Sequence, residues 1–165
     1  MTTYQLAQLN IAVMKEPLES PTMADFVANL DRINALAESA PGFVWRFQTD
    51  EGDATAARPL GDDTLINLSV WQDLASLNNY VYRSAHAQIM KRRREWFERL
   101  REAHVVLWWV ATGHRPSLDE AIAKLNRLRS SGPSEEAFAF RQAYPAPGAL
   151  PPGRPFTLGD ECPAH

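Results

Sequence analysis

Cysteine is almost absent from the chain. The single cysteine, Cys162, excludes both a disulfide within the chain and a metal site made of cysteine thiolates. This composition is typical of proteins that fold in a reducing compartment, and we expect a cytoplasmic location. No stretch approaches the roughly 20 apolar residues that cross a bilayer. The apolar first residues also lack the basic flank and the small-residue cleavage site of a signal peptide. We therefore expect no membrane association.

A strong charge of either sign is also missing. The net charge of −3 gives no electrostatic reason to expect a nucleic-acid partner. The one basic run, Lys91-Arg92-Arg93-Arg94, is followed by acidic residues at helical spacing, with Glu98 four residues after Arg94. We expect an ion-paired, solvated helix face. Two alternatives stay open, in which Arg93 and Arg92 guide an anionic substrate to a pocket, or the run binds nucleic acid.

The sequence has few of the motifs that announce a chemistry. Its four histidines show none of the spacings that hold a metal ion. Phosphate-binding loops, dinucleotide fingerprints and nucleophilic triads are absent as well. We expect no metal site, and we look for evidence of function in a pocket rather than in a sequence motif.

What the chain does have is regular apolar patterning over most of its 165 residues, enough for one domain. Apolar alternation predicts strands at 4–14, 43–49, 64–71 and 104–112. Helical spacing predicts a helix from a Thr22 cap to Pro41-Gly42, one from Asp73 to about Glu102 with a bend near Ser84-Ala85, and one from a Ser117 capping box to Gly132-Pro133. A short edge strand at 137–143 is possible. The strand at 104–112 is apolar on both faces, which is typical of a strand covered on both sides.

The order β-α-β-β-α-β predicts an α+β fold of the ferredoxin-like, split βαβ type, with an antiparallel sheet. We expect this domain to occupy residues 1–144, and residues 145–165, which hold six of the 12 prolines, to form a flexible tail. Helices of such a fold are expected to cover one sheet face only. The other face also carries apolar residues: Ala7, Leu9, Ile11, Ile66, Leu68 and Val70. A second copy would cover it, so we expect a homodimer through sheet faces.

Four segments resemble DUF3291, a bacterial family defined only as a domain of unknown function. They read YQLAQLNIA, DFVANLDRINALAESAPGFVWR, YVYRSAHAQIMKRRREWFERLREAHVVLWWVATGHRPSLDEA and FAFRQAYPAP, and together they span roughly residues 4–147. That family is grouped with the dimeric α+β barrel superfamily, so the resemblance implies this fold. The superfamily includes cofactor-independent quinol monooxygenases of the antibiotic-biosynthesis type, heme-degrading monooxygenases, chlorite dismutase relatives and small stress-response proteins. The resemblance therefore implies a monooxygenase-like protein. It does not fix the reaction, because proteins with this fold carry out many chemistries.

Polar residues on one side of the predicted sheet mark a candidate pocket. They share one strand parity: Asn10, Asn67, Ser69 and Trp71. We assign this parity to the helix-covered face, toward which Tyr82 and His86 also point, because residues four apart are neighbours on a helix. The sequence therefore predicts a small-molecule pocket that contains an amide, an imidazole, a phenol and an indole.

The residue types suggest how such a pocket would act on a phenolic or quinol substrate. His86 is the expected base, because an imidazole titrates near pH 6.5, and Asn10 and Tyr82 are its expected polar partners. A flat aromatic ligand is expected to lie between Trp71, Tyr80 and Trp108. The full set of expected binding residues is Trp71, Asn67, Ser69, Tyr80, Trp108 and Arg93.

Three functions stay open at this point. The first is a cofactor-independent monooxygenase, and the second is a non-catalytic ligand-binding or stress-response dimer. The third is heme binding, because heme-degrading members of the superfamily use an Asn on the first strand, a Trp at the end of the third and a His on the next helix. Asn10, Trp71 and His86 are similar in element and order. Each candidate also has a purely structural interpretation, which we favour for Trp71, for His104 at a strand entry and for His114 in a surface loop.

Overall fold

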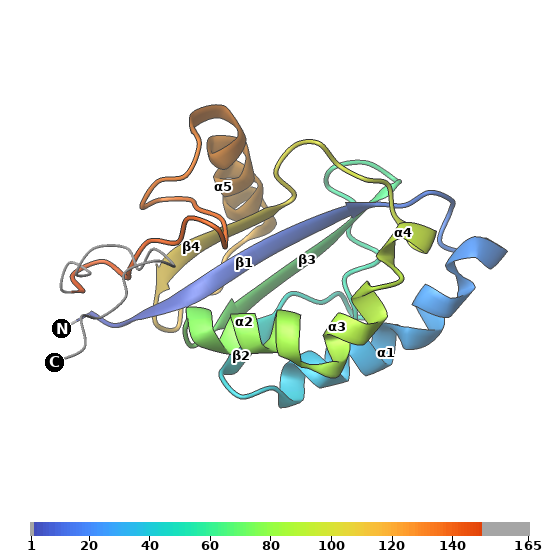
Figure 1. Cartoon of the computed structure of the whole chain (residues 1–165), viewed down its shortest axis with the longest axis horizontal. Coiled ribbons are helices and arrows are strands. Elements are labelled where there is room, and N and C mark those ends of the chain that lie inside the picture. Colours follow the sequence, from blue (N-terminus) through green and yellow to red (C-terminus); the bar gives the residue numbers. More distant parts are fainter. Residues whose placement is uncertain (1, 150–165) are drawn as a thin grey trace, which may run out of the picture.

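The computed structural model describes residues 2–149 and contains one four-stranded antiparallel sheet of order β2-β3-β1-β4 (Figure 1). The strands are β1 (Tyr4–Val13), β2 (Phe43–Arg46), β3 (Thr64–Trp71) and β4 (Val105–Ala111). The helices are the 3-10 turn η1 (Pro21–Met23), α1 (Ala24–Ser39), α2 (Leu74–Arg83), α3 (Ala85–Met90), α4 (Arg93–Trp96) and α5 (Leu118–Ser131). This order of elements confirms the predicted ferredoxin-like α+β fold.

Strand β1 lies at the centre of the sheet and sets which residues share a face. Ala7 pairs with Val70 of β3 and with Trp108 of β4, whereas Asn10 pairs with Asn67 and with Val105. Because side chains alternate along a strand, odd-numbered and even-numbered residues of β1 lie on opposite faces. The polar residues therefore share one face, as their parity predicted.

The other sheet face is covered by α5, which contradicts the expectation that helices cover only one face. Ala7, Leu9 and Trp108 form one buried cluster with Ala121 and Leu125 of α5. In Figure 1, α5 lies on the opposite side of the sheet from α1, α2 and α3. A helix with an apolar stripe must bury it, and this sheet face is the apolar surface available. The reason given for a homodimer through sheet faces is thus lost, and the homodimer itself stays a prediction.

The helix predicted from Asp73 to about Glu102 is instead three short helices. The bend expected near Ser84-Ala85 is a complete break, because Ser84 has an extended backbone and its hydroxyl caps α3 by accepting from the His86 amide. The prediction that the helix reaches Glu102 is wrong. Phe97 is extended and pairs with Met14, so the chain returns to the end of β1 after Trp96.

The early end of α4 also changes the ion pairs of the basic run. Glu98 no longer follows Arg94 on a continuous helix, so the predicted spacing between them does not apply. Arg92 instead pairs with Asp25 of α1, with Nη2 2.7 Å from Oδ2, and with Glu95, with Nε 2.8 Å from Oε2. Part of the basic run is therefore an ion-paired surface, as expected, but with different partners.

The predicted ends of the other elements agree less closely. Thr22 does not cap α1, which follows directly from the turn η1. Strand β2 stops at Arg46 rather than at Thr49. The edge strand predicted at 137–143 is reduced to isolated bridges, of which the one between Phe138 and Leu107 joins the segment to β4. Most of the predicted tail lies outside the described residues. Within residues 2–149, no helix has the length and apolar character needed to cross a membrane.

Two predicted caps are confirmed. The Asp73 carboxylate accepts from the Ser76 amide at 2.8 Å, and the Ser117 hydroxyl accepts from the Glu120 amide at 3.1 Å. The Glu120 carboxylate does not return to the cap. It accepts from the Trp108 indole at 3.0 Å and bonds His114 at 2.7 Å instead, so it fixes the β4 face beneath α5.

Candidate functional site

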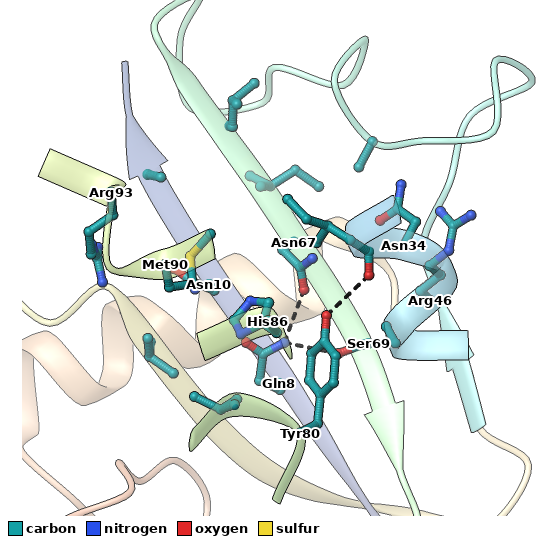
Figure 2. A pocket seen from close by; sticks show the side chains of 18 of the residues that line it. Gln8, Asn10, Asn34, Arg46, Asn67, Ser69, Tyr80, His86, Met90 and Arg93 are labelled. Atoms are coloured by element: carbon teal, nitrogen blue, oxygen red, sulfur yellow. Dashed lines mark hydrogen bonds between the residues drawn. The ribbon is translucent and has the colours of Figure 1, made fainter. Parts of the chain in front are cut away.

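A cavity of about 470 Å³ lies between the polar sheet face and helices α1, α2 and α3 (Figure 2). Strands β1, β2 and β3 supply its floor, and the helices supply its roof. The labelled side chains that line it are Gln8, Asn10, Asn34, Arg46, Asn67, Ser69, Tyr80, His86, Met90 and Arg93. Trp71 and Tyr82 also contribute to the lining. The pattern of the sequence therefore brings most of the predicted site residues to one cavity.

A hydrogen-bond network fixes the floor of the cavity. Gln8 Nε2 donates to Asn67 Oδ1 at 3.1 Å and to Ser69 Oγ at 2.9 Å. Ser69 Oγ also accepts from Trp71 Nε1 at 2.9 Å. Gln8, the hub of this network, was missed as a site residue, although it shares the parity of Asn10 on β1. That shared parity was the signal that could have identified it.

Three rings stack beside this network. Trp71 and Tyr80 lie nearly parallel, with ring centroids 5.0 Å apart and 25° between planes, and Tyr80 contacts His86 at 4.7 Å. Trp71 and Tyr80 therefore pack on each other, with no room for a ligand between them. Trp108 lies on the opposite sheet face, because it pairs with Ala7, and it does not line the cavity. The expected sandwich of these three residues around a ligand is wrong.

The buried phenol of the site is Tyr80 rather than Tyr82. Tyr80 donates to the Ile33 carbonyl at 3.3 Å, and burial raises the pKa of Tyr80, so the hydroxyl keeps its proton. Tyr82 is 62% exposed and packs its ring edge on Phe140. The break at Ser84 separates Tyr82 and His86 into two helices, so their spacing of four residues does not make them neighbours on one face.

Two residues that line the cavity each have a buried polar atom that makes no hydrogen bond. Within residues 2–149, three buried side-chain polar atoms lack a partner, and two of them are Asn10 Oδ1 and His86 Nδ1. The third, Ser20 Oγ, belongs to a residue outside the cavity lining. Leaving such an atom unpaired costs on the order of 1–3 kcal/mol, which makes it a feature that needs a physical reason.

The imidazole of His86 is held in its neutral form. Burial lowers the pKa of His86, and the nearby backbone of Val81 acts more weakly in the opposite direction. A neutral imidazole has one nitrogen that accepts a hydrogen bond and can take up a proton. His86 therefore has the charge state that a general base needs at neutral pH.

Comparison with known families assigns the chain to one of them. Residues 5–152 match the family described as a domain of unknown function, DUF3291. The chain belongs to the DUF3291 family. A comparison of this DUF3291 chain with curated proteins finds no match.

Several solved structures resemble the DUF3291 chain in part. NE2512, a protein of unknown function from Nitrosomonas europaea, is 17% identical over 69% of this chain and 94% of its own, with a TM-score of 0.44. SnoaB, a cofactor-independent oxygenase from Streptomyces nogalater, is 15% identical over 70% of this chain and 98% of its own, with the same TM-score. PA3566 from Pseudomonas aeruginosa is 11% identical over 71% of this chain and 99% of its own, with a TM-score of 0.45. Likeness at this level gives no basis for transferring a substrate or a residue role.

A metal cluster is not formed by the described part of this DUF3291 chain. Among residues 2–149, no group of three or more His, Cys, Asp or Glu side chains lies close enough together to hold a metal ion. His104 lines the cavity, and His114 bonds Glu120 on the other sheet face. Of these histidines, His104 is therefore the one that an occupant of the cavity could meet besides His86.

Lowering the pH from 7.5 to 5.5 is expected to reduce the free energy of unfolding. Burial lowers the pKa of both His86 and His104, and the Arg93 charge adds to the effect on His104. The stability that neutral histidines contribute is fully present above a pH of about 6.5. It is lost as the pH falls from there through the folded-state pKa, because the unfolded chain binds protons that the folded chain does not.

Urea unfolding at several pH values measures this dependence. A variant with both His86→Gln and His104→Gln is expected to have a shallower dependence over the same range, because neither glutamine titrates. An equally steep dependence in the variant would show that other groups cause it.

Proposed function

We propose that this DUF3291 protein binds a small hydroxylated aromatic molecule in the cavity between the sheet and helices α1–α3. The observation that carries the proposal is that two residues lining one cavity, Asn10 and His86, each have a buried polar atom without a hydrogen-bond partner, Oδ1 and Nδ1. A ligand hydroxyl that donates to either atom would remove the cost of leaving it unpaired.

The size and the remaining lining of the cavity support a flat, largely apolar occupant. A volume of about 470 Å³ falls in the range of roughly 300–1,000 Å³ that small-molecule sites occupy. Apolar side chains from the helices, from β3 and from the segment after α4 line much of it: Phe26, Leu30, Ile33, Leu65, Met90 and Phe97. Such a wall favours the body of an aromatic ring, while the polar floor orients its substituents.

His86 is the group that would accept a proton from the bound hydroxyl. Burial raises the pKa of Tyr80 and lowers that of His86, so Tyr80 holds its own proton while His86 has room for another. In the oxygenase form of the proposal, the resulting phenolate gives electrons to dioxygen. With a quinol, each O₂ takes up four electrons: one oxygen atom replaces a ring hydrogen, the ring is oxidised to a hydroxyquinone, and the second oxygen atom leaves as water.

The test is binding and oxygen consumption with a panel of quinols and polyphenols. His86→Ala and Asn10→Ala are each expected to weaken binding by about 1 kcal/mol, roughly fivefold, through the loss of one hydrogen bond. Gln88→Ala is the matched control, because Gln88 is exposed on α3 and does not line the cavity. Equal affinity in all four proteins would contradict the proposal. Binding without oxygen consumption would select the non-catalytic ligand-binding function.

Heme is the alternative occupant, because a neutral histidine nitrogen without a partner is also an axial ligand. The fit is incomplete, since the His86 ring already lies against Tyr80 with centroids 4.7 Å apart. Titration with hemin separates the two possibilities. A Soret band that disappears in His86→Ala would replace the aromatic ligand by heme, and its absence would remove heme from consideration.

A further inference from the structure

Arg93 is a half-buried cation of the cavity whose charge is not neutralised by a neighbouring carboxylate. It lines the cavity, and among residues 2–149 its guanidinium forms no ion pair and no side-chain hydrogen bond. The adjacent Arg92 is exposed and holds Asp25 and Glu95. A guanidinium has five N–H donors, so Arg93 retains its full binding capacity inside the site.

The other arginine of the cavity is already engaged. Arg46 donates from Nε to Glu38 Oε1 at 2.7 Å and from Nη2 to the Gly52 carbonyl at 2.8 Å. Figure 2 shows Arg46 and Arg93 at opposite ends of the labelled side chains, with Asn10, Asn67 and His86 between them. The cavity is therefore electrically asymmetric, with a satisfied cation at one end and an unsatisfied cation at the other.

His104 and Lys91, which line the same cavity as Arg93, do not neutralise its charge. His104 lines the same cavity, and burial, aided by the Arg93 charge, lowers the pKa of His104. Lys91 also contributes to the lining, and its Nζ donates to the neutral Gln88 Oε1 at 3.3 Å. The acidic residue of the lining, Asp53, bonds the Thr55 amide and hydroxyl in the loop that also supplies Gly52 to Arg46. It therefore belongs to the opposite end of the cavity.

We infer that the ligand of this cavity is a hydroxylated aromatic acid whose carboxylate pairs with Arg93 while its hydroxyl reaches Asn10 and His86. This inference rests on the proposed function and adds the substrate class to it. A guanidinium matches a carboxylate through two parallel N–H···O bonds, which fixes the orientation of the acid as well as its affinity. The ring then lies along the apolar wall between the two polar contacts.

A purely structural role for Arg93 is the competing explanation, because the stem of an arginine can cover apolar surface while its head stays in water. Arg93→Met separates the two roles, since methionine keeps an apolar side chain and removes the charge. Arg94→Met is the matched control, because Arg94 is the exposed neighbour that does not line the cavity.

The experiment is calorimetric titration of the full chain with 3,4-dihydroxybenzoate and its phenylacetate and cinnamate homologues, each beside its methyl ester. These homologues vary the distance from hydroxyl to carboxylate. The wild type and Arg94→Met are expected to bind at least one acid about tenfold or more tightly than its ester. Arg93→Met is expected to lose that preference while its affinity for the ester stays unchanged. His86→Ala is expected to weaken acid and ester alike.

Each outcome decides between the two proposals. Equal binding of acid and ester by the wild type would overturn the anionic ligand and leave the proposed aromatic site intact. An acid preference that survives in Arg93→Met would overturn the role of Arg93. Failure of every acid and every ester to bind would contradict both the inference and the proposed function.

Discussion

Trp71→Ala is expected to lose about 3–5 kcal/mol of unfolding free energy, the usual cost of truncating a large buried aromatic side chain. Trp71 is 1% exposed at the end of β3. Its ring stacks on Tyr80 and meets the Phe43 ring edge-on at 5.5 Å, so its removal leaves a cavity between the sheet and α2. Urea unfolding of the variant and the wild type measures the loss.

Trp71→Phe is the control that separates packing from hydrogen bonding. It keeps an aromatic ring against Tyr80 but removes the indole N–H that Ser69 accepts at 2.9 Å. We expect a loss of about 1–2 kcal/mol, because Ser69 still accepts from Gln8. A Trp71→Ala loss as small as that of Trp71→Phe would show that the stack with Tyr80 contributes little. The floor of the cavity would then be held by its hydrogen bonds alone.

Strand parity was the part of the site that the sequence could predict. Alternation along β1 and β3 is a local property, and antiparallel pairing of Asn10 with Asn67 carries it from one strand to the next. The same reasoning required an assignment of this parity to the face toward which His86 points, and Asn10, Asn67 and His86 do line one cavity. Trp108 was misplaced because β4 is apolar on both faces, so its pattern contains no signal that tells one face from the other.

The helical part of the site was harder to predict because it depends on where a helix stops. The apolar spacing continues through Ser84, yet the Ser84 hydroxyl begins a new helix by accepting from the His86 amide at 3.1 Å. A capping residue inside a periodic segment is compatible with either one helix or two. When the segment forms two helices, Tyr80 rather than Tyr82 packs against His86. Tertiary packing, which the local sequence does not reveal, decides between one helix and two.

The position of α5 had no local signal at all. Its capping residue Ser117 and its apolar residues Leu125 and Leu128 predict the helix, but nothing in them says which sheet face they cover. The sheet face beneath α5 is apolar, and either a second chain or a helix of the same chain could bury it. This is why a dimer was predicted where the chain supplies its own cover.

Gly42→Ala is expected to cost about 3 kcal/mol, because two separate penalties meet at that position. Gly42 follows α1 with a φ of +83°, a conformation that costs an L-residue roughly 1–2 kcal/mol. A Cβ there would also overlap the side-chain Cβ and Oγ of Ser76, in the first turn of α2. The overlap displaces the helix that carries Tyr80, and overpacking of this kind costs about 1–3 kcal/mol.

Gly132→Ala isolates the conformational penalty from the overlap. Gly132 follows α5 with a φ of +73°, and a Cβ there meets no atom within 4 Å. We expect a loss of about 1 kcal/mol, because the strain is partly offset by the lower entropy of alanine in the unfolded chain. Urea unfolding gives both values, and ligand titration of Gly42→Ala reports whether α2 has moved. Equal losses in the two variants would show that Ser76 gives way freely, so that the contact between Gly42 and α2 does not set the position of Tyr80 above the cavity.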